Sequence, residues 1–164
     1  MSDGGVVALV SATGRAGEHA SLLAHAVRHL VVAGVVDRIV VVTPESEMDL
    51  PADVCVVPDV AAGVAGIGAD ARVVLVHDPS HAFAPVELIR QVVATVLTDD
   101  VSVVPVLPCS DTVKRLDADG FVIDTPDRGG LRVIQTPLGY PAAVIRSGAV
   151  VPGVVPVGAR TVAT

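Results

Sequence analysis

The sequence predicts an α/β protein: a three-layer α/β/α sandwich around a mostly parallel sheet, with a β arm that projects from it. Short continuous runs of Val, Ile and Leu, typical of strands buried on both faces, alternate with stretches in which apolar residues recur at helical spacing. One polar segment, 111–125, interrupts this alternation and carries an Asp-Gly hairpin signal. Alternating strands and helices require a sheet that is covered by helices on both faces.

The strands are expected where the chain is continuously apolar. They lie at 6–10, 38–44, 53–59, 72–78, 101–108 and 131–137, and the end of the chain can supply one more. Ligands bind at the carboxyl ends of the strands in such sheets. Asp78 and Ser110 follow two of these ends, so we expect the chemistry there.

Two helices are expected between the strands, at 18–33 and 85–97. The apolar stripe of the first consists of Leu22, Ala26, Val27, Leu30 and Val31. Gly34 suits the position after its C-terminus, and Pro85 suits the start of the second helix. The Gly- and Ala-rich segment 60–71 is predicted as a loop or a weak helix.

The polar segment 111–125 contains two short β-prone runs joined by a turn at Asp119 and Gly120. It is too polar for a core strand, so we expect an arm at about 110–131 that projects from the sheet. A lone two-stranded hairpin is marginal in water and needs something to pack on. We therefore expect a homodimer that forms through this arm.

Composition limits the class of protein. A length of 164 residues suits a single domain covering 1–164, and 2% aromatic residues predict an aliphatic core. Although mean hydropathy is +0.66, no apolar run approaches the roughly 18 residues of a membrane span. The N-terminus has no basic region before its apolar run, so no secretory signal is expected and the cytoplasm is the expected location.

The net charge and the pattern of metal-ligating residues argue against nucleic-acid-binding and metal-binding proteins. The net charge is −7 and the chain has a single lysine, Lys114, so no basic stripe for nucleic acid is present. A phosphate ligand stays possible, because a few arginines and backbone amides suffice. Cys55 and Cys109 are predicted as buried free thiols. His25 and His29 have helical spacing but no evident third ligand, which disfavours a metal site.

The stretch from 73 to 140 carries four motifs: VLVHD (74–78), SDTVKR (110–115), TPDRGGL (125–131) and QTP (135–137). Their order and spacing resemble those of the methylerythritol phosphate cytidylyltransferases. The resemblance implies a Rossmann-like nucleotidyltransferase fold. It also implies the transfer of a cytidylyl group from CTP to a sugar-alcohol phosphate in isoprenoid precursor synthesis.

The resemblance assigns acceptor-binding residues to the arm and to the QTP motif. Thr112 and Arg128 would reach into the active site of a second subunit and hold the acceptor phosphate, together with Thr136 of the subunit's own sheet. A hydroxyl donor and a guanidinium suit a phosphate monoester, because both form charge-assisted hydrogen bonds. The alternative is that the charged residues of the arm are ordinary solvated hairpin residues.

The VHD motif implies a catalytic and metal-binding carboxylate. Asp78 would contact the acceptor and hold Mg²⁺, which prefers one or two carboxylates plus phosphate oxygens. The alternative is that Asp78 caps the turn at Pro79. His81 stands where the family has an acceptor-binding arginine, and it has a shorter reach and only partial charge.

The nucleotide-side motifs are eroded. The family has a long Gly-rich first loop with an Arg and a Lys that grip CTP. Here Gly14 and Gly17 remain as nucleotide-binding candidates and Arg15 as the catalytic cation, but the loop is short and no lysine follows. The alternative is that these are turn glycines. The segment 60–71 lacks the family's base-reading Arg and Ser, and Arg160 aligns weakly with a further family lysine.

Two functions follow. In the first, the protein is an active cytidylyltransferase that uses CTP and Mg²⁺. In the second, it is a catalytically degenerate relative, a pseudoenzyme that keeps the acceptor-phosphate half-site and the arm and acts as a sugar-phosphate binder or a regulatory subunit. Losing preorganised cations is costly in rate, so the eroded motifs favour low or no activity. The intact acceptor motifs are expected under both functions.

Overall fold

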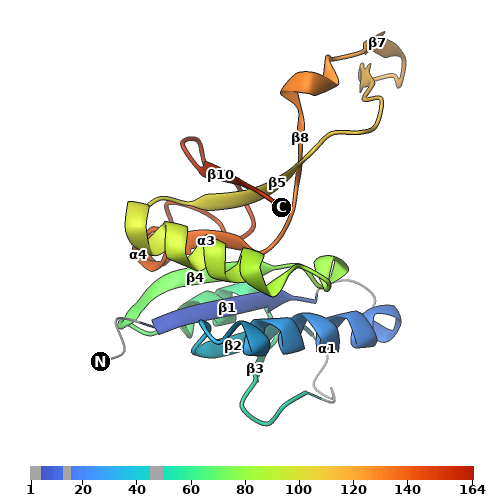
Figure 1. Ribbon diagram of the computed structural model, residues 1–164. Helices are drawn as coiled ribbons and strands as arrows, with labels where there is room; N and C mark the ends of the chain where they lie inside the picture. Colours follow the sequence, from blue (N-terminus) through green and yellow to red (C-terminus); the bar gives the residue numbers. More distant parts are fainter. Residues whose placement is uncertain (1–4, 13–15, 45–49) are drawn as a thin grey trace.

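A computed structural model of the chain describes residues 5–12, 16–44 and 50–164, the side chains of 16–20 excepted. The elements in chain order are β1 (Gly5–Ser11), α1 (Ala16–Ala33), β2 (Arg38–Val42), β3 (Cys55–Val57), α2 (Val60–Ala65), β4 (Ala71–His77), the 3₁₀ turn η1 (Pro79–His81), α3 (Val86–Asp99), β5 (Val103–Pro108), β6 (Arg115–Leu116), β7 (Val122–Asp124), the 3₁₀ turn η2 (Arg128–Gly130), β8 (Arg132–Ile134), β9 (Leu138–Pro141), α4 (Ala142–Arg146) and β10 (Arg160–Ala163). Figure 1 shows them as a layered body with an arm that extends beyond β5 and β8.

The sheet has the order β10-β5-β9-β4-β1-β2-β3, and β8 pairs with β5. The strands β1, β2, β3 and β4 pair in parallel, as do β5 and β10. In contrast, β9 is antiparallel to both β4 and β5, and β8 is antiparallel to β5. The sheet is thus mixed, because the arm reverses the chain and β8 and β9 return against the direction of β5.

Helices cover both faces of the sheet. Alternate side chains of a strand point to opposite faces, and two apolar clusters result. One cluster joins α1 and α3 to Val6, Ala8 and Val10 of β1, and the other joins α4 to Val7 and Leu9. Figure 1 shows α1 and α3 side by side on the same face. The predicted three-layer α/β/α arrangement is confirmed.

The apolar stripe of α1 differs in part from the predicted one. The buried residues are Leu23, Ala26, Val27, Leu30 and Ala33. The predicted Val31 is 52% exposed, and Leu22 is only partly buried. The apolar residues of this helix are so dense that periodicity alone allows more than one face. The contact with α3 and β1 selects the face that contains Leu23.

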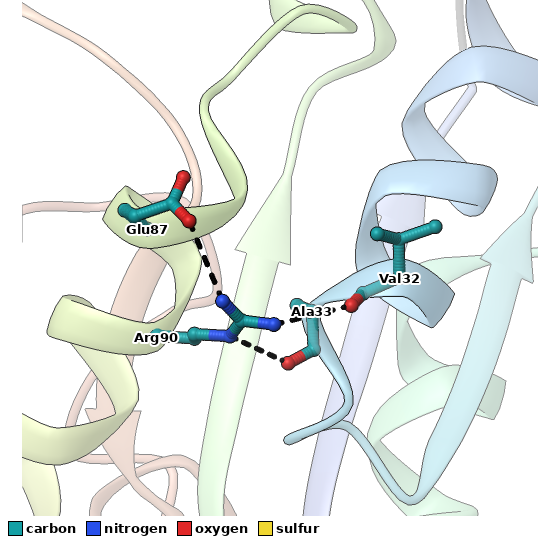
Figure 2. A network of polar contacts seen from close by, with 4 residues as sticks. All are labelled: Val32, Ala33, Glu87 and Arg90. Atoms are coloured by element: carbon teal, nitrogen blue, oxygen red, sulfur yellow. Dashed lines mark hydrogen bonds and ion pairs between the residues drawn. The ribbon is translucent and has the colours of Figure 1, made fainter.

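Arg90 joins the two helices of this layer. Its Nε donates to the carbonyl of Ala33 at 2.9 Å, and its Nη2 donates to that of Val32 at 3.4 Å. Glu87 lies 3.4 Å from the same guanidinium, as Figure 2 shows. The last carbonyls of a helix lack partners within it, so Arg90 satisfies the C-terminus of α1 from α3. Gly34 follows with a φ of +66°, as predicted for that position.

Gly139 allows α3 to lie close to β9. A Cβ at this position would lie 2.5 Å from Cγ1 of Val92 and 2.8 Å from Cγ2 of Val96. Both distances are shorter than carbon–carbon contact allows. The absence of a side chain at Gly139 therefore sets how closely this helix approaches the sheet.

The arm begins where β5 leaves the sheet. Strands β6 and β7 form the predicted antiparallel hairpin, and Gly120 in its turn has a φ of +88°. The arm's apolar side chains are largely exposed, with Phe121 at 73%. The prediction of a buried strand at 131–137 is wrong, because β8, which pairs with the end of β5 where the arm leaves the sheet, has all its residues exposed. The buried continuation is β9, after Pro137.

The two cysteines differ from the prediction in their burial. Cys55 and Cys109 are free, but Cys55 is exposed and Cys109 only partly buried, so the prediction of buried thiols is wrong. Cys55 lies on β3, which is the edge strand at one end of the sheet. Among the described helices, none combines the length and the apolar character that crossing a membrane requires.

Candidate functional site at the carboxyl edge of the sheet

The polar centre of this edge is the junction of β4 with the segment that leads into β9. Antiparallel pairing of Val76 with Leu138 brings Thr136 beside the residues that end β4. The Thr136 hydroxyl oxygen accepts a hydrogen bond from the backbone N–H of Asp78 at 3.2 Å and lies 2.9 Å from Nδ1 of His77. The VHD and QTP motifs, 58 residues apart at Asp78 and Thr136, thus form one site.

His77 is fully buried at the end of β4. The pKa of His77 is lowered to about 4, mainly by burial and to a smaller extent by the nearby His81 and His29, while Asp78 has the opposite effect. The imidazole is therefore neutral at neutral pH. Its Nε2 atom is buried and has no hydrogen-bond partner among the described residues.

Asp78 is exposed immediately after β4. Its Oδ1 accepts a hydrogen bond from the backbone N–H of Ser80 at 2.8 Å, so the side chain caps η1, as the alternative interpretation predicted. The described residues contain no group of three or more His, Cys, Asp or Glu that could hold a metal ion. A single carboxylate nevertheless fits Mg²⁺ that is bound mainly through a ligand's phosphate oxygens.

His81 ends η1 and lies partly buried next to this centre. The segment that carries it is held against α1 at two points. Nδ1 of His29 lies 2.9 Å from the carbonyl oxygen of Ala84, and the rings of His25 and Phe83 have centroids 5.0 Å apart. The two histidines that sequence spacing singled out on α1 therefore have a structural role in positioning the segment of His81.

Two cavities meet at this centre, and His81 and Thr136 line both. The smaller, about 270 Å³, extends over β1, where Leu9 and Ser11 line it, and also contacts Asp78. The larger cavity is about 430 Å³. The larger cavity is also lined by Ser80, Phe83, Ala84, Pro85, Leu88, Leu107, Gln135 and Thr164. Both are mainly apolar, so their few polar groups decide the orientation of a ligand.

The arm residues lie elsewhere in the chain's own fold. Thr112 and Arg128 are exposed, and neither lines these two cavities as the structure describes them. Nη1 of Arg128 donates to the carbonyl of Ser110 at 2.7 Å and so links the two limbs of the arm. Within one chain, the structure thus brings together Asp78, His81 and Thr136 but not the arm pair.

The nucleotide-side candidates are only partly described. Gly14 and Arg15 lie outside the described residues, and Gly17 is in the first turn of α1. Arg160 forms an ion pair with Asp99 at the start of β10, which is the amino edge of the sheet and the wrong edge for the site.

Sequence reasoning missed three residues of this site: His77, Ser11 and Gln135. His77 is part of the VHD motif, but only the acidic residue of that motif, Asp78, was predicted to have a role in the site. Ser11 ends β1 and lines the smaller cavity, and Gln135 lines the larger. A polar residue at the carboxyl end of a buried strand was the signal that could have found Ser11.

Comparisons of the sequence and of the fold with known proteins identify the same family that the motifs resemble. The family model described as IspD, 2-C-methyl-D-erythritol 4-phosphate cytidylyltransferase, matches residues 16–151. A relative with that enzyme name from Rhodococcus opacus is 40% identical over 168 residues, covering 87% of this chain and 74% of the relative. One from Nocardia farcinica is 41% identical over 172 residues, covering 89% and 75%.

Solved structures share the fold. The 4-diphosphocytidyl-2C-methyl-D-erythritol synthase of Anaerococcus prevotii has a TM-score of 0.78 at 20% identity and covers 98% of this chain and 87% of its own. The cytidylyltransferase of Thermus thermophilus has a TM-score of 0.70 at 23% identity and covers 88% and 74%. Taken with the family model and the sequence relatives, the motifs at the carboxyl edge lead to one conclusion: this chain belongs to the 2-C-methyl-D-erythritol 4-phosphate cytidylyltransferase family.

Proposed function

We propose that this protein transfers the cytidylyl group of CTP to 2-C-methyl-D-erythritol 4-phosphate, a step of isoprenoid precursor synthesis, as one nucleotidyltransferase-like domain in the cytoplasm. The observation that carries the proposal is the contact of Thr136 with the end of β4, which joins the family's two sheet motifs beside Asp78. An oxygen of the acceptor phosphate would attack the α-phosphorus of CTP. Pyrophosphate would leave, and the product would be a cytidine diphosphate ester.

In this proposal, residues of one subunit orient the acceptor. Thr136 and His81 would hold the acceptor phosphate where the two cavities meet. Asp78 would hold Mg²⁺, which when bound supplies charge neutralisation for the triphosphate. Gly14, Gly17 and Arg15 would face the nucleotide.

The rest of the acceptor site would come from a second copy of the chain. In a homodimer, the partner subunit's Thr112 and the partner subunit's Arg128 would complete the phosphate site. Two facts support this arrangement: Arg128 is exposed at a distance from its own subunit's cavities, and the apolar side chains of the arm are uncovered. Buried against a dianion, a guanidinium forms charge-assisted hydrogen bonds that are about twice as strong as neutral ones.

The first experiment measures pyrophosphate release from CTP and Mg²⁺ with and without the acceptor, and calorimetric binding of CTP and of acceptor separately. Acceptor-dependent release and binding of both ligands are expected. The variant Arg15→Ala should lower turnover strongly if Arg15 supports the triphosphate. Turnover that is unchanged in Arg15→Ala would remove this residue from the site.

A mixing experiment tests the shared site. Asp78→Asn and Arg128→Ala should each be nearly inactive, but each defect lies on a different side of the subunit boundary. Random exchange makes half of the dimers mixed, and each mixed dimer has one intact site, so about a quarter of the wild-type activity should return. No recovery in a mixture that demonstrably exchanges subunits would contradict the shared site.

A second candidate function is the non-catalytic relative that retains only the acceptor half-site. The favouring observation is that the described lining of the smaller cavity contains no lysine or arginine. On β2 and α2, that lining is Val42 and Val60, both apolar. Acceptor binding without CTP binding, and without pyrophosphate release, would support this candidate against the enzyme.

A further inference from the structure

We propose that His77 is a positioning residue that makes the Thr136 hydroxyl a fixed hydrogen-bond donor toward the ligand, so that this part of the site selects an oxyanion. The identity of the ligand as the acceptor phosphate rests on the proposed function. The hydrogen bonds that orient the hydroxyl involve three neighbouring groups of the protein, whatever the ligand: the His77 ring, the Asp78 amide and the Thr136 hydroxyl.

Two groups in the described part of the chain lie within hydrogen-bond distance of the Thr136 hydroxyl oxygen. Nδ1 of His77 lies 2.9 Å from that oxygen, and the backbone N–H of Asp78 donates to it at 3.2 Å. The His77 ring is fully buried and so cannot turn toward water. Thr136 itself lines both cavities, so it is the member of this group that faces a ligand.

The position of the ring proton follows from the surroundings of the other ring nitrogen. A neutral imidazole has one N–H donor and one acceptor nitrogen. Nε2 of His77 is buried without a hydrogen-bond partner in the described part of the chain. A proton on Nε2 would leave a buried N–H donor unpaired, whereas a proton on Nδ1 leaves only a lone pair unpaired. Unpaired buried N–H groups are the rarer case in proteins, so the proton belongs on Nδ1.

The direction of the hydrogen bond that the Thr136 hydroxyl forms with a ligand follows from this proton position. A hydroxyl has one proton and two acceptor lone pairs. The N–H groups of His77 and Asp78 use both lone pairs, so the hydroxyl proton has to point away from them and can only donate. With the other His77 tautomer, Thr136 would donate to the ring and offer a lone pair to a ligand's hydroxyl. The protonation of Nδ1 therefore selects a phosphate oxygen at this point.

The direct test determines the tautomer by NMR, in protein without ligand. Long-range ¹H–¹⁵N correlation on protein labelled with ¹⁵N-histidine reports which ring nitrogen of each histidine carries the proton. The signal of His77 is the one that disappears in His77→Asn. A protonated Nδ1 and an unprotonated Nε2 are expected between about pH 6 and 8. A proton on Nε2, or averaging between both tautomers, would overturn the proposal whatever the protein's function.

The functional test compares two variants of His77. Asn can place an N–H donor near the position of Nδ1, whereas Leu fills the space without a donor. The acceptor KM should rise about tenfold or more in His77→Leu, from weakening of a charge-assisted bond, and stay within about threefold of wild type in His77→Asn. The KM for CTP should be unchanged in both. Equal loss in both variants would mean a packing role and would overturn the proposal.

A double variant separates orientation from packing. In the Thr136→Val background the hydroxyl is absent, so adding His77→Leu should have no further effect on acceptor affinity. Additive losses would contradict action through Thr136. Calorimetry with the acceptor and with inorganic phosphate is the readout, and thermal unfolding verifies that each variant is folded. If wild type binds neither ligand, the proposed function fails, and the NMR result still decides the tautomer.

Discussion

The body of the sheet and the arm treat their apolar residues in opposite ways. Strand β1 buries every side chain from Val6 to Val10, and β4 does so from Val73 to Val76. On the arm, Phe121 is 73% exposed, and Val122 and Ile123 of β7 are also largely exposed. The hydrophobic effect therefore stabilises the body within a single chain, whereas the fold of the single chain leaves the apolar surface of the arm in water.

This difference separates two kinds of substitution. Changes in the body should lower the free energy of unfolding and leave ligand affinity nearly unaffected. If the surface of the arm contacts a second subunit, changes on the arm should lower ligand affinity and leave the free energy of unfolding nearly unaffected. His77 is the exception to examine, because it is buried like the body and contacts the group that faces the ligand.

The largest effect is expected on the arm. Arg128→Ala should lower kcat/KM for the acceptor about 10²- to 10³-fold, as for other preorganised charged donors, while the free energy of unfolding stays within about 0.5 kcal/mol of wild type. Arg132→Ala is the matched control, because Nη1 of Arg132 contacts the carbonyls of Gly129 and Leu131 on the same arm. Steady-state kinetics and urea unfolding measure the two quantities. Equal losses of kcat/KM in both variants would mean that the acceptor site depends on the structure of the arm and not on the charge of Arg128.

The next effect concerns His77 and pH. The pKa of His77 is lowered from 6.5 to about 4 in the folded chain, so between these values the unfolded state binds the additional proton. Stability should therefore fall as pH decreases from 6.5 to 4, and this group accounts for about 3 kcal/mol of the loss. His77→Asn should lack that part of the decline. Urea unfolding at several pH values without divalent cations measures it, and parallel curves for the two proteins would contradict the assignment.

Much of the body could be predicted from the sequence. Each buried strand up to β5 and both long helices lie where apolar runs and helical spacing indicated. The hairpin also lies as predicted, because its Asp-Gly turn is a strong local signal. The pairing of the strands was harder to predict from the sequence. Nothing local in Leu138 to Pro141 specifies that β9 inserts antiparallel between β4 and β5, since that depends on how the arm returns.

The site was predictable in its motifs but not in its contacts. Asp78, His81 and Thr136 line one cavity, and all three belong to or adjoin the two motifs that the sequence places at the sheet edge. The strand predicted as buried at 131–137 has exposed residues in β8, because apolar side chains alone do not specify burial within the chain. An apolar residue that another molecule would cover has the same sequence signature as one covered by its own fold. His77 was missed for a related reason: a buried polar residue within a strand gives no periodic signal.

A third prediction examines the body alone. Gly139→Ala would place a methyl group against Val92 and Val96, at distances below contact. Overpacking of this kind should lower the free energy of unfolding by about 2 kcal/mol, as α3 moves away from β9. Acceptor affinity should stay within about threefold of wild type. A combined loss of stability and affinity would break the separation between body and ligand site. Gly130→Ala is the matched control for the loss of a glycine, because a methyl group added at this arm position would have no neighbour within 4 Å.

The smallest effect is expected where α3 holds the end of α1. Arg90→Ala leaves the carbonyls of Val32 and Ala33 without this donor and should cost about 1 kcal/mol in urea unfolding. Glu87→Ala removes only an exposed ion pair with the same guanidinium, so its effect should stay below about 0.5 kcal/mol. Equal losses would mean that the ion pair orients Arg90 and that the bonds to α1 depend on it. Because the carbonyl bonds join two helices of one layer, the loss should appear as lower stability of the body and not as a change at the arm.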